Sequence, residues 1–190
     1  MNTTGSEERG SQLASLALPR YSSLPSFGIY VDQLVSLVND IVGSFAMPEE
    51  KTLTASMVNN YVKHGVIPKP ISKKYTRDHI ACLIVVCILK KVFSIPEITL
   101  LIRMHIAHLT TEQAFDTFAE SLENSVALML YGKTVNPIKE QAETIENGLL
   151  IERAVLTVSS KLFVQLNMAT EAAKTTSKDS DTPKQKRKKA

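Results

Sequence analysis

The chain has 190 residues, of which 44% are hydrophobic, and this length and composition suit one domain with an extension around a sizeable core. Its 22 basic and 19 acidic residues nearly balance at a net charge of +3. The absence of Trp, the two cysteines and the lack of a basic and apolar leader in residues 1–20 argue against secretion. We therefore expect a cytoplasmic protein with free thiols.

The N-terminal third predicts an arm followed by two helices. Residues 1–25 are rich in Ser, Thr and Gly without a sustained apolar period, which predicts a flexible, loosely docked N-terminal arm in which Leu13, Leu16, Ala17 and Leu18 could pack as a short turn. Apolar residues then repeat at helical spacing from Tyr30 to Val42, which predicts the first helix. A second helix is predicted over residues 54–64, where apolar and polar residues occupy opposite faces until Gly65 offers a stop.

The middle of the chain predicts a short wing and a buried helix. Pro68 and Pro70 remove backbone donors from residues 66–77, so this basic segment can form at most short edge strands. Thr76 is a suitable cap for the next helix. The run from Ile80 to Leu89 is apolar on every side but far shorter than the roughly 20 residues that span a bilayer, so we expect a buried helix and no membrane segment.

The C-terminal half predicts three more helices. Ser94-x-x-Glu97 and Thr110-x-x-Gln113 are capping-box patterns, and each predicts a helix start. Asn136 and Pro137 are expected to open a last, long helix, whose apolar stripe over residues 138–166 suits pairing with a second chain or packing across its own fold. Gly148 is either a kink or a boundary in it. Residues 171–190 predict a disordered basic tail.

Charge is sorted by position along the chain. Residues 51–91 hold eight basic residues and one acid, whereas residues 1–50 hold two against six and residues 92–170 hold five against nine. A local concentration of cations indicates a polyanionic partner better than the overall charge does. On the predicted helix 54–64, Asn and Lys side chains also share the polar face, and these groups suit base edges and phosphates.

The order of residues in this region resembles the DNA-binding domain of MerR-type transcription regulators. The resemblance is carried by Tyr61, Lys63, Gly65, Val66, Ile67 and Pro68, then Tyr75, Asp78 and Ile80, then Phe93-Ser94-Ile95-Pro96-Glu97-Ile98. Asn59-Asn60-Tyr61-Val62-Lys63-His64, with Pro68-Lys69-Pro70 and Lys73-Lys74-Tyr75, is similar to a bacterial family described only as a domain of unknown function. The second resemblance implies no activity. The first implies a winged helix-turn-helix whose second helix enters the major groove and whose wing touches the flanking backbone.

Together these observations predict a mainly α fold. A winged helix-turn-helix-like domain with a small β wing is expected at residues 26–109, and a C-terminal helical region for dimerisation or effector binding at residues 110–170. The predicted function is a non-enzymatic, DNA-binding transcriptional regulator of bacterial type that binds double-stranded DNA as a homodimer. The predicted DNA-contacting residues are Ser56, Asn59, Asn60, Tyr61, Lys63, Lys69, Lys73, Lys74, Tyr75 and Arg77. Of these, Tyr61 is expected either to pack or to touch the DNA backbone.

The sequence leaves two other functions open. One is a protein-interaction module that keeps the winged shell and uses the stripe of residues 138–166. The other is a sensor that holds a small effector among the C-terminal helices, around Phe115, Phe118 and Phe163, although the sequence reveals no obvious ligand pocket.

Other reactive residues are better explained as structural. His105 and His108 lie one turn apart with Glu112 beyond, but a third and fourth metal ligand are not visible. Cys82 and Cys87 point roughly 140° apart on a helix, which suits core packing better than a shared metal. His64 and His79 are interpreted as cap or interface residues. Without a catalytic order or a phosphate loop, no enzyme, metal or cofactor is expected.

Overall fold

The computed structural model of the chain describes residues 17–45, 52–131 and 145–179, and these residues are mainly helical, as predicted. The helices are α2 (Val31–Val42), α3 (Ala55–Lys63), α4 (Arg77–Leu89), α5 (Ile95–His105), α6 (Thr111–Tyr131) and α7 (Ile145–Asp179). Within the same ranges, the 3-10 turns η1 (Tyr21–Ser23), η2 (Gly43–Phe45) and η3 (Ile106–His108) connect or extend them.

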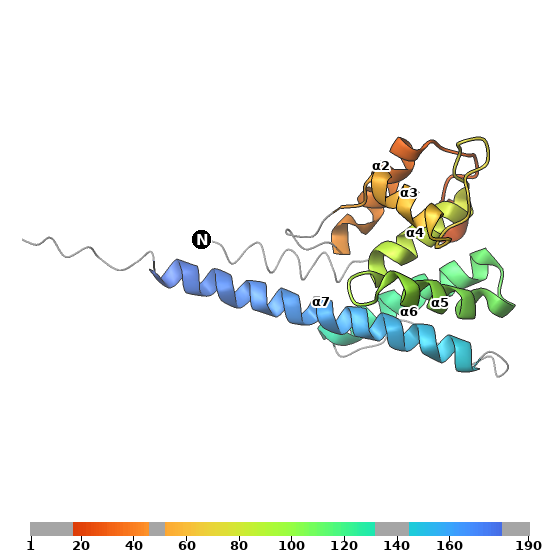
Figure 1. Cartoon of the computed structure of the whole chain (residues 1–190). Coiled ribbons are helices and arrows are strands. Elements are labelled where there is room, and N and C mark those ends of the chain that lie inside the picture. Colours follow the sequence, from red (N-terminus) through yellow and green to blue (C-terminus); the bar gives the residue numbers. More distant parts are fainter. Residues whose placement is uncertain (1–16, 46–51, 132–144, 180–190) are drawn as a thin grey trace, which may run out of the picture.

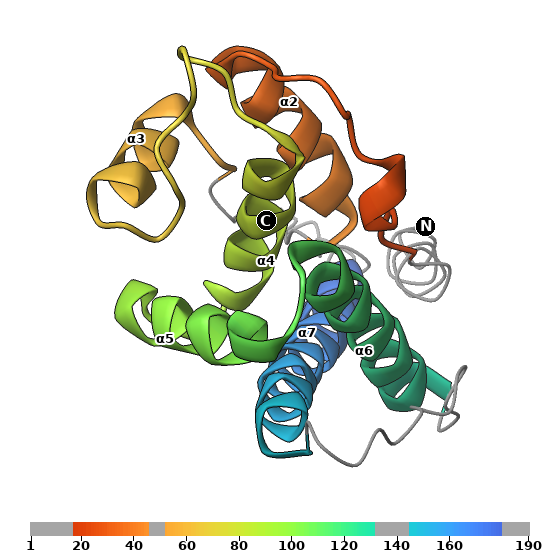
Figure 2. The ribbon, with the colours of Figure 1, turned by 90° about the vertical axis from the view of Figure 1, so that its right-hand side faces the viewer.

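Helix α4 lies at the centre of the molecule. Helices α2 and α3 flank it on one side, and α5, α6 and α7 lie on the other (Figures 1 and 2). Nearly the whole run from His79 to Leu89 is buried, as its uniform apolar composition predicts. Leu83, Ile84 and Val86 have no exposed surface at all, so α4 forms the middle of the core. Within the described ranges, no helix is both long and apolar enough to cross a membrane.

Local signals set the helix boundaries where the sequence predicts them. Helix α3 ends just before Gly65, whose φ of +68° is a left-handed conformation that glycine adopts without strain. At the start of α5, the Ser94 backbone N–H donates to the Glu97 carboxylate at 2.7 Å. At the start of α6, the Gln113 N–H donates to the Thr110 hydroxyl at 3.2 Å. Both predicted capping boxes are therefore confirmed.

The prediction of a β wing is wrong, because residues 66–77 form no strand within the described part of the chain. Ile71 and Lys74 form one isolated antiparallel bridge, and Ile29 and Tyr75 form another. Ser72 and Lys73, between the first pair, have φ values of 50° and 62°. These values suit a two-residue hairpin turn. Since prolines at 68 and 70 cannot donate, the loop of residues 64–76 (the basic loop) stops at this single turn.

The C-terminal helices share one core with the preceding helices. Phe115 and Phe118 of α6 belong to the same hydrophobic cluster as Ile84 of α4 and Ile98 of α5, so the core crosses the boundary expected at residues 109 and 110. Helix α7 runs unbroken through Gly148 and extends to residue 179, into the segment expected to be a disordered tail. The helix start expected at residues 136 and 137 lies outside the described residues, as do residues 180–190.

The described part of the N-terminal arm, residues 17–25, is docked on the helices. Leu18 and Leu24 are buried in the core. The Arg20 guanidinium forms a bidentate pair with the Glu123 carboxylate, at 3.0 and 2.7 Å. The Tyr21 hydroxyl donates to Asp78 at 2.5 Å. The sequence indicated loose docking but not these polar partners, because they are far away along the chain. Residues 1–16 lie outside the described ranges.

Candidate nucleic-acid interface and an adjoining cavity

Helix α3 is fixed at its N-terminal end by polar contacts. The Thr54 hydroxyl accepts a hydrogen bond from the Met57 N–H at 3.3 Å, which caps the helix. The Asn39 side chain, on α2, accepts from the Leu53 N–H at 2.8 Å and donates to the Leu53 carbonyl at 2.9 Å. This amide satisfies both backbone groups of Leu53 and holds the start of α3 beside α2.

The two faces of α3 differ as the sequence predicts. Val58 and Tyr61 are buried, and the polar side chains point outward. The exposed residues on this face are Ser56, Asn59, Asn60 and Lys63. Tyr61, for which packing and a backbone contact are both expected, is only 4% exposed. Its ring packs in the core, so it is not available as the predicted surface contact.

The basic loop places three exposed lysines near α3, namely Lys69, Lys73 and Lys74. Figure 2 shows this loop leaving the end of α3 and returning past α2 to the start of α4. The Lys74 ammonium lies 5.6 Å from the centre of the Tyr30 ring. Tyr75 is buried, and its ring contacts the His79 ring edge-on, with 5.4 Å between the two ring centres. Tyr75, a predicted DNA contact, is therefore a core residue as well.

Arg77 is only partly available to a ligand. Its Nε donates to the Leu24 carbonyl at 2.9 Å, and its guanidinium lies 5.3 Å from the centre of the Tyr21 ring. These contacts bind the N-terminal arm to the start of α4. Arg77 therefore has a structural role beside any contact with a phosphate.

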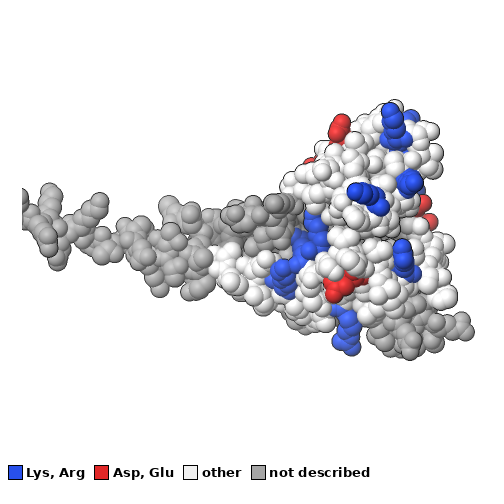
Figure 3. All heavy atoms as spheres, viewed as in Figure 1, with Lys and Arg blue, Asp and Glu red and all other residues white. Residues whose placement is uncertain are grey.

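The charge of this region is one-sided but dispersed. Residues 52–77 contain five basic residues and no Asp or Glu. In Figure 3, Lys and Arg side chains are scattered over the upper part of the molecule, where α2, α3 and the basic loop lie, with mostly neutral surface between them and a few acidic side chains at the edges. Such spacing suits separate contacts along a phosphate backbone.

A cavity that the sequence did not reveal adjoins this region. Its volume is about 480 Å³, and it lies between the end of α3, the basic loop and helices α4, α5 and α6. Phe115 and Phe118 line it, as the sensor hypothesis expected, whereas Phe163 is exposed elsewhere on α7. The expectation of no obvious pocket is therefore wrong. The walls of the cavity come from several separate segments, so no single stretch of the sequence could predict it.

The reactive side chains beside the cavity are held in neutral forms. The Cys82 thiol donates to the Val66 carbonyl at 3.7 Å, and burial, with a smaller effect of Asp78, raises the pKa of Cys82 to about 12. Burial also lowers the pKa of His105, whose Nε2 lies 3.0 Å from the Ala114 carbonyl oxygen. In the described part of the chain, no three His, Cys, Asp or Glu side chains are grouped to hold a metal ion.

Comparison with known proteins gives one family. The model of the family described as a domain of unknown function (DUF1836) matches residues 19–123. This range contains all the predicted DNA-contacting residues and every residue lining the cavity except Ile151. No curated protein and no solved structure matches the chain significantly.

Proposed function

Because the chain belongs to the DUF1836 family, whose description names no activity, we propose its function from the site itself: a non-enzymatic, DNA-binding transcriptional regulator of bacterial type. Helix α3 enters the major groove, and the basic loop lies against the flanking backbone. This arrangement follows the resemblance to MerR-type regulators, with the two-residue turn at Ser72 and Lys73 in place of a full wing.

The observation that carries the proposal is the exposed polar face of α3. Asn59, Asn60 and Lys63 are exposed, while Val58 and Tyr61 anchor the opposite face in the core. Asn side chains can bond the adenine edge through two hydrogen bonds, and Lys can bond guanine or phosphate. An anchored helix that presents such groups has the form required for reading a groove.

The basic loop supplies the contacts that do not depend on sequence. Lys69, Lys73 and Lys74 are exposed and close to α3 along the chain. Each phosphate neutralised by such a cation releases counterions, which gives binding a steep dependence on salt. The loop would therefore set affinity, whereas α3 would set the choice of sequence.

Homodimerisation is part of the proposal, through the projecting portion of α7. This helix extends beyond the other helices (Figure 1). On it, Val164 and Met168 are 53% and 67% exposed, although both are apolar. A second copy would cover them and would bring two α3 helices to one DNA duplex. Sedimentation of the Val164→Glu variant should show a monomer if this surface is the dimer interface.

The function is tested by selecting bound fragments from genomic DNA and measuring their affinity across a salt series. Replacing Lys73 and Lys74 by Gln should weaken binding to every fragment and flatten the salt dependence. Replacing Asn59 by Ala should instead change the preference among fragments. The exposed Arg153 of α7 provides the control, since Arg153→Gln should leave both properties unchanged.

Two results would refute the proposal that the protein is a DNA-binding regulator. One is the absence of DNA retention at low salt, and the other is unchanged binding in both the lysine and the asparagine variants. Recovery of one stoichiometric partner protein, together with no DNA retention, would support the protein-interaction module. The exposed apolar side chains of α7 are the surface that such a partner would contact.

A further inference from the structure

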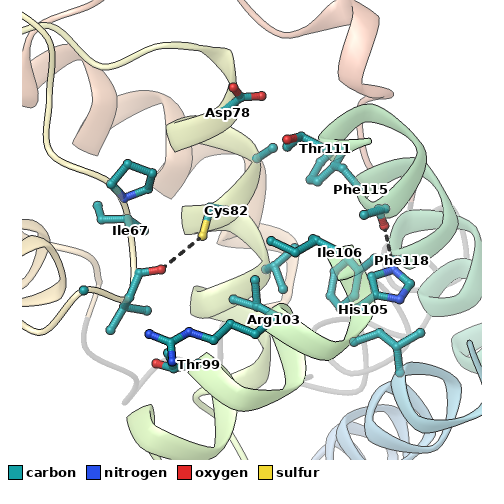
Figure 4. Close-up of a pocket in the computed structure, with 18 of the residues that line it drawn as sticks. Ile67, Asp78, Cys82, Thr99, Arg103, His105, Ile106, Thr111, Phe115 and Phe118 are labelled. Atoms are coloured by element: carbon teal, nitrogen blue, oxygen red, sulfur yellow. Dashed lines mark hydrogen bonds between the residues drawn. The ribbon is translucent and has the colours of Figure 1, made fainter. Parts of the chain in front are cut away.

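The cavity beside α3 has walls from several elements and an apolar interior. Val66, Ile67 and Pro68 of the basic loop form one wall, and Phe115 and Phe118 lie opposite (Figure 4). Its volume of about 480 Å³ falls within the range of small-molecule sites, which is roughly 300–1,000 Å³. Phe115 and Phe118 are only 3% and 1% exposed, so the apolar lining as a whole, rather than two open ring faces, favours an apolar molecule.

The charged side chains at the edge of the cavity differ in whether they already have a partner. The Arg103 side chain has no ion-pair or hydrogen-bond partner among the described residues. In Figure 4 it reaches across the lower side of the cavity towards Thr99. Asp78, at the opposite edge, points away from Cys82 and accepts the hydrogen bond of the Tyr21 hydroxyl. Lys69 of the basic loop also lines the cavity and is exposed. The available charge is therefore positive.

We propose that this cavity binds a small aromatic or other apolar molecule that carries one anionic group, with Arg103 as the counter-ion of that group. The apolar body lies against Phe115 and Phe118, and the carboxylate or similar group remains at the edge beside the guanidinium. A guanidinium pairs with a carboxylate through two parallel hydrogen bonds, so it selects an acid over a neutral or cationic molecule of equal size.

The experiment titrates the full chain by calorimetry with three probes of one shape: naphthylacetate, naphthylethanol and naphthylethylammonium. We expect naphthylacetate to bind about tenfold more tightly than the other two. The Arg103→Gln variant should lose this preference. Arg153→Gln, which removes an exposed cation from α7 outside the cavity lining, should keep it.

A second variant tests the position of the site. Ile106 lines the cavity and is 44% exposed, so Ile106→Trp can fill the space without displacing core atoms. This variant should bind all three probes more weakly, and thermal melting should confirm that it is folded. The proposal is overturned if naphthylacetate does not saturate the unmodified protein, or if its preference survives Arg103→Gln. These outcomes do not depend on whether the protein binds DNA.

Discussion

His105 is a buried imidazole at the end of α5, and only 7% of it is exposed. Burial lowers its pKa from the ordinary value of 6.5, so the folded protein holds it neutral under conditions where the unfolded chain protonates it. The stability that it contributes is present above about pH 6.5 and is lost as the pH falls towards the lower folded pKa.

The melting temperature should therefore fall between about pH 7 and pH 5, and it should fall less in a His105→Gln variant, which has no imidazole to protonate. Thermal melts at a series of pH values measure both slopes. An equal slope in the two proteins would mean that other groups cause the change.

Ser72 and Lys73 adopt left-handed φ values that favour glycine. Ser72→Gly should therefore be neutral or should stabilise the fold by up to about 1 kcal/mol, and Lys73→Gly should do the same. Only Lys73→Gly should weaken DNA binding, because it alone removes a cation. Urea unfolding and DNA titration of both variants separate the two effects, and equal DNA affinities would contradict the role of Lys73.

At the scale of the elements, the Asn39 side chain holds the start of α3 against α2 through both backbone groups of Leu53. Asn39→Ala would leave these groups without their partner, and we expect the free energy of unfolding to fall by about 1–3 kcal/mol. Urea unfolding measures this loss. The exposed Asn60 provides the control, since Asn60→Ala should cost less than about 0.5 kcal/mol.

Element positions could be predicted because their signals are local. Gly65 and the Ser94–Glu97 pair act within one helical turn of the residues that they order, and the sequence displays both. The sequence left both packing and a backbone contact open for Tyr61, and it did not predict the burial of Tyr75. A tyrosine suits either a surface contact or a core position, and only the tertiary packing decides between them.

In the candidate site too, features set by local sequence could be predicted, and features set by tertiary packing could not. The exposed Asn59 and Lys63 follow from helical periodicity, because they lie opposite buried apolar positions. The position of Arg103 at the cavity could not be predicted from the sequence, since it depends on how α5 packs beside the basic loop. Contacts between residues distant along the chain are absent from any single local pattern.

At the scale of the whole molecule, the Arg20–Glu123 pair joins the N-terminal arm to α6. Its geometry is bidentate, but the Arg20 side chain is 41% exposed, so solvent screens the attraction. A double-mutant cycle with Arg20→Gln and Glu123→Gln should give a coupling energy of about 1 kcal/mol, measured by urea unfolding. A coupling near zero would mean that this pair does not help to dock the arm, which would then be held by the buried Leu18 and Leu24 and by the contacts of Tyr21 and Arg77.

Helix α3 packs chiefly against α2, and Val62, near its C-terminal end, lines the cavity. Its amide hydrogens should therefore exchange with deuterated solvent sooner than those of the enclosed α4. A molecule that fills the cavity would touch Val62 and Gly65 and would slow this local opening. The mobility of the proposed reading helix would then depend on the small molecules around it.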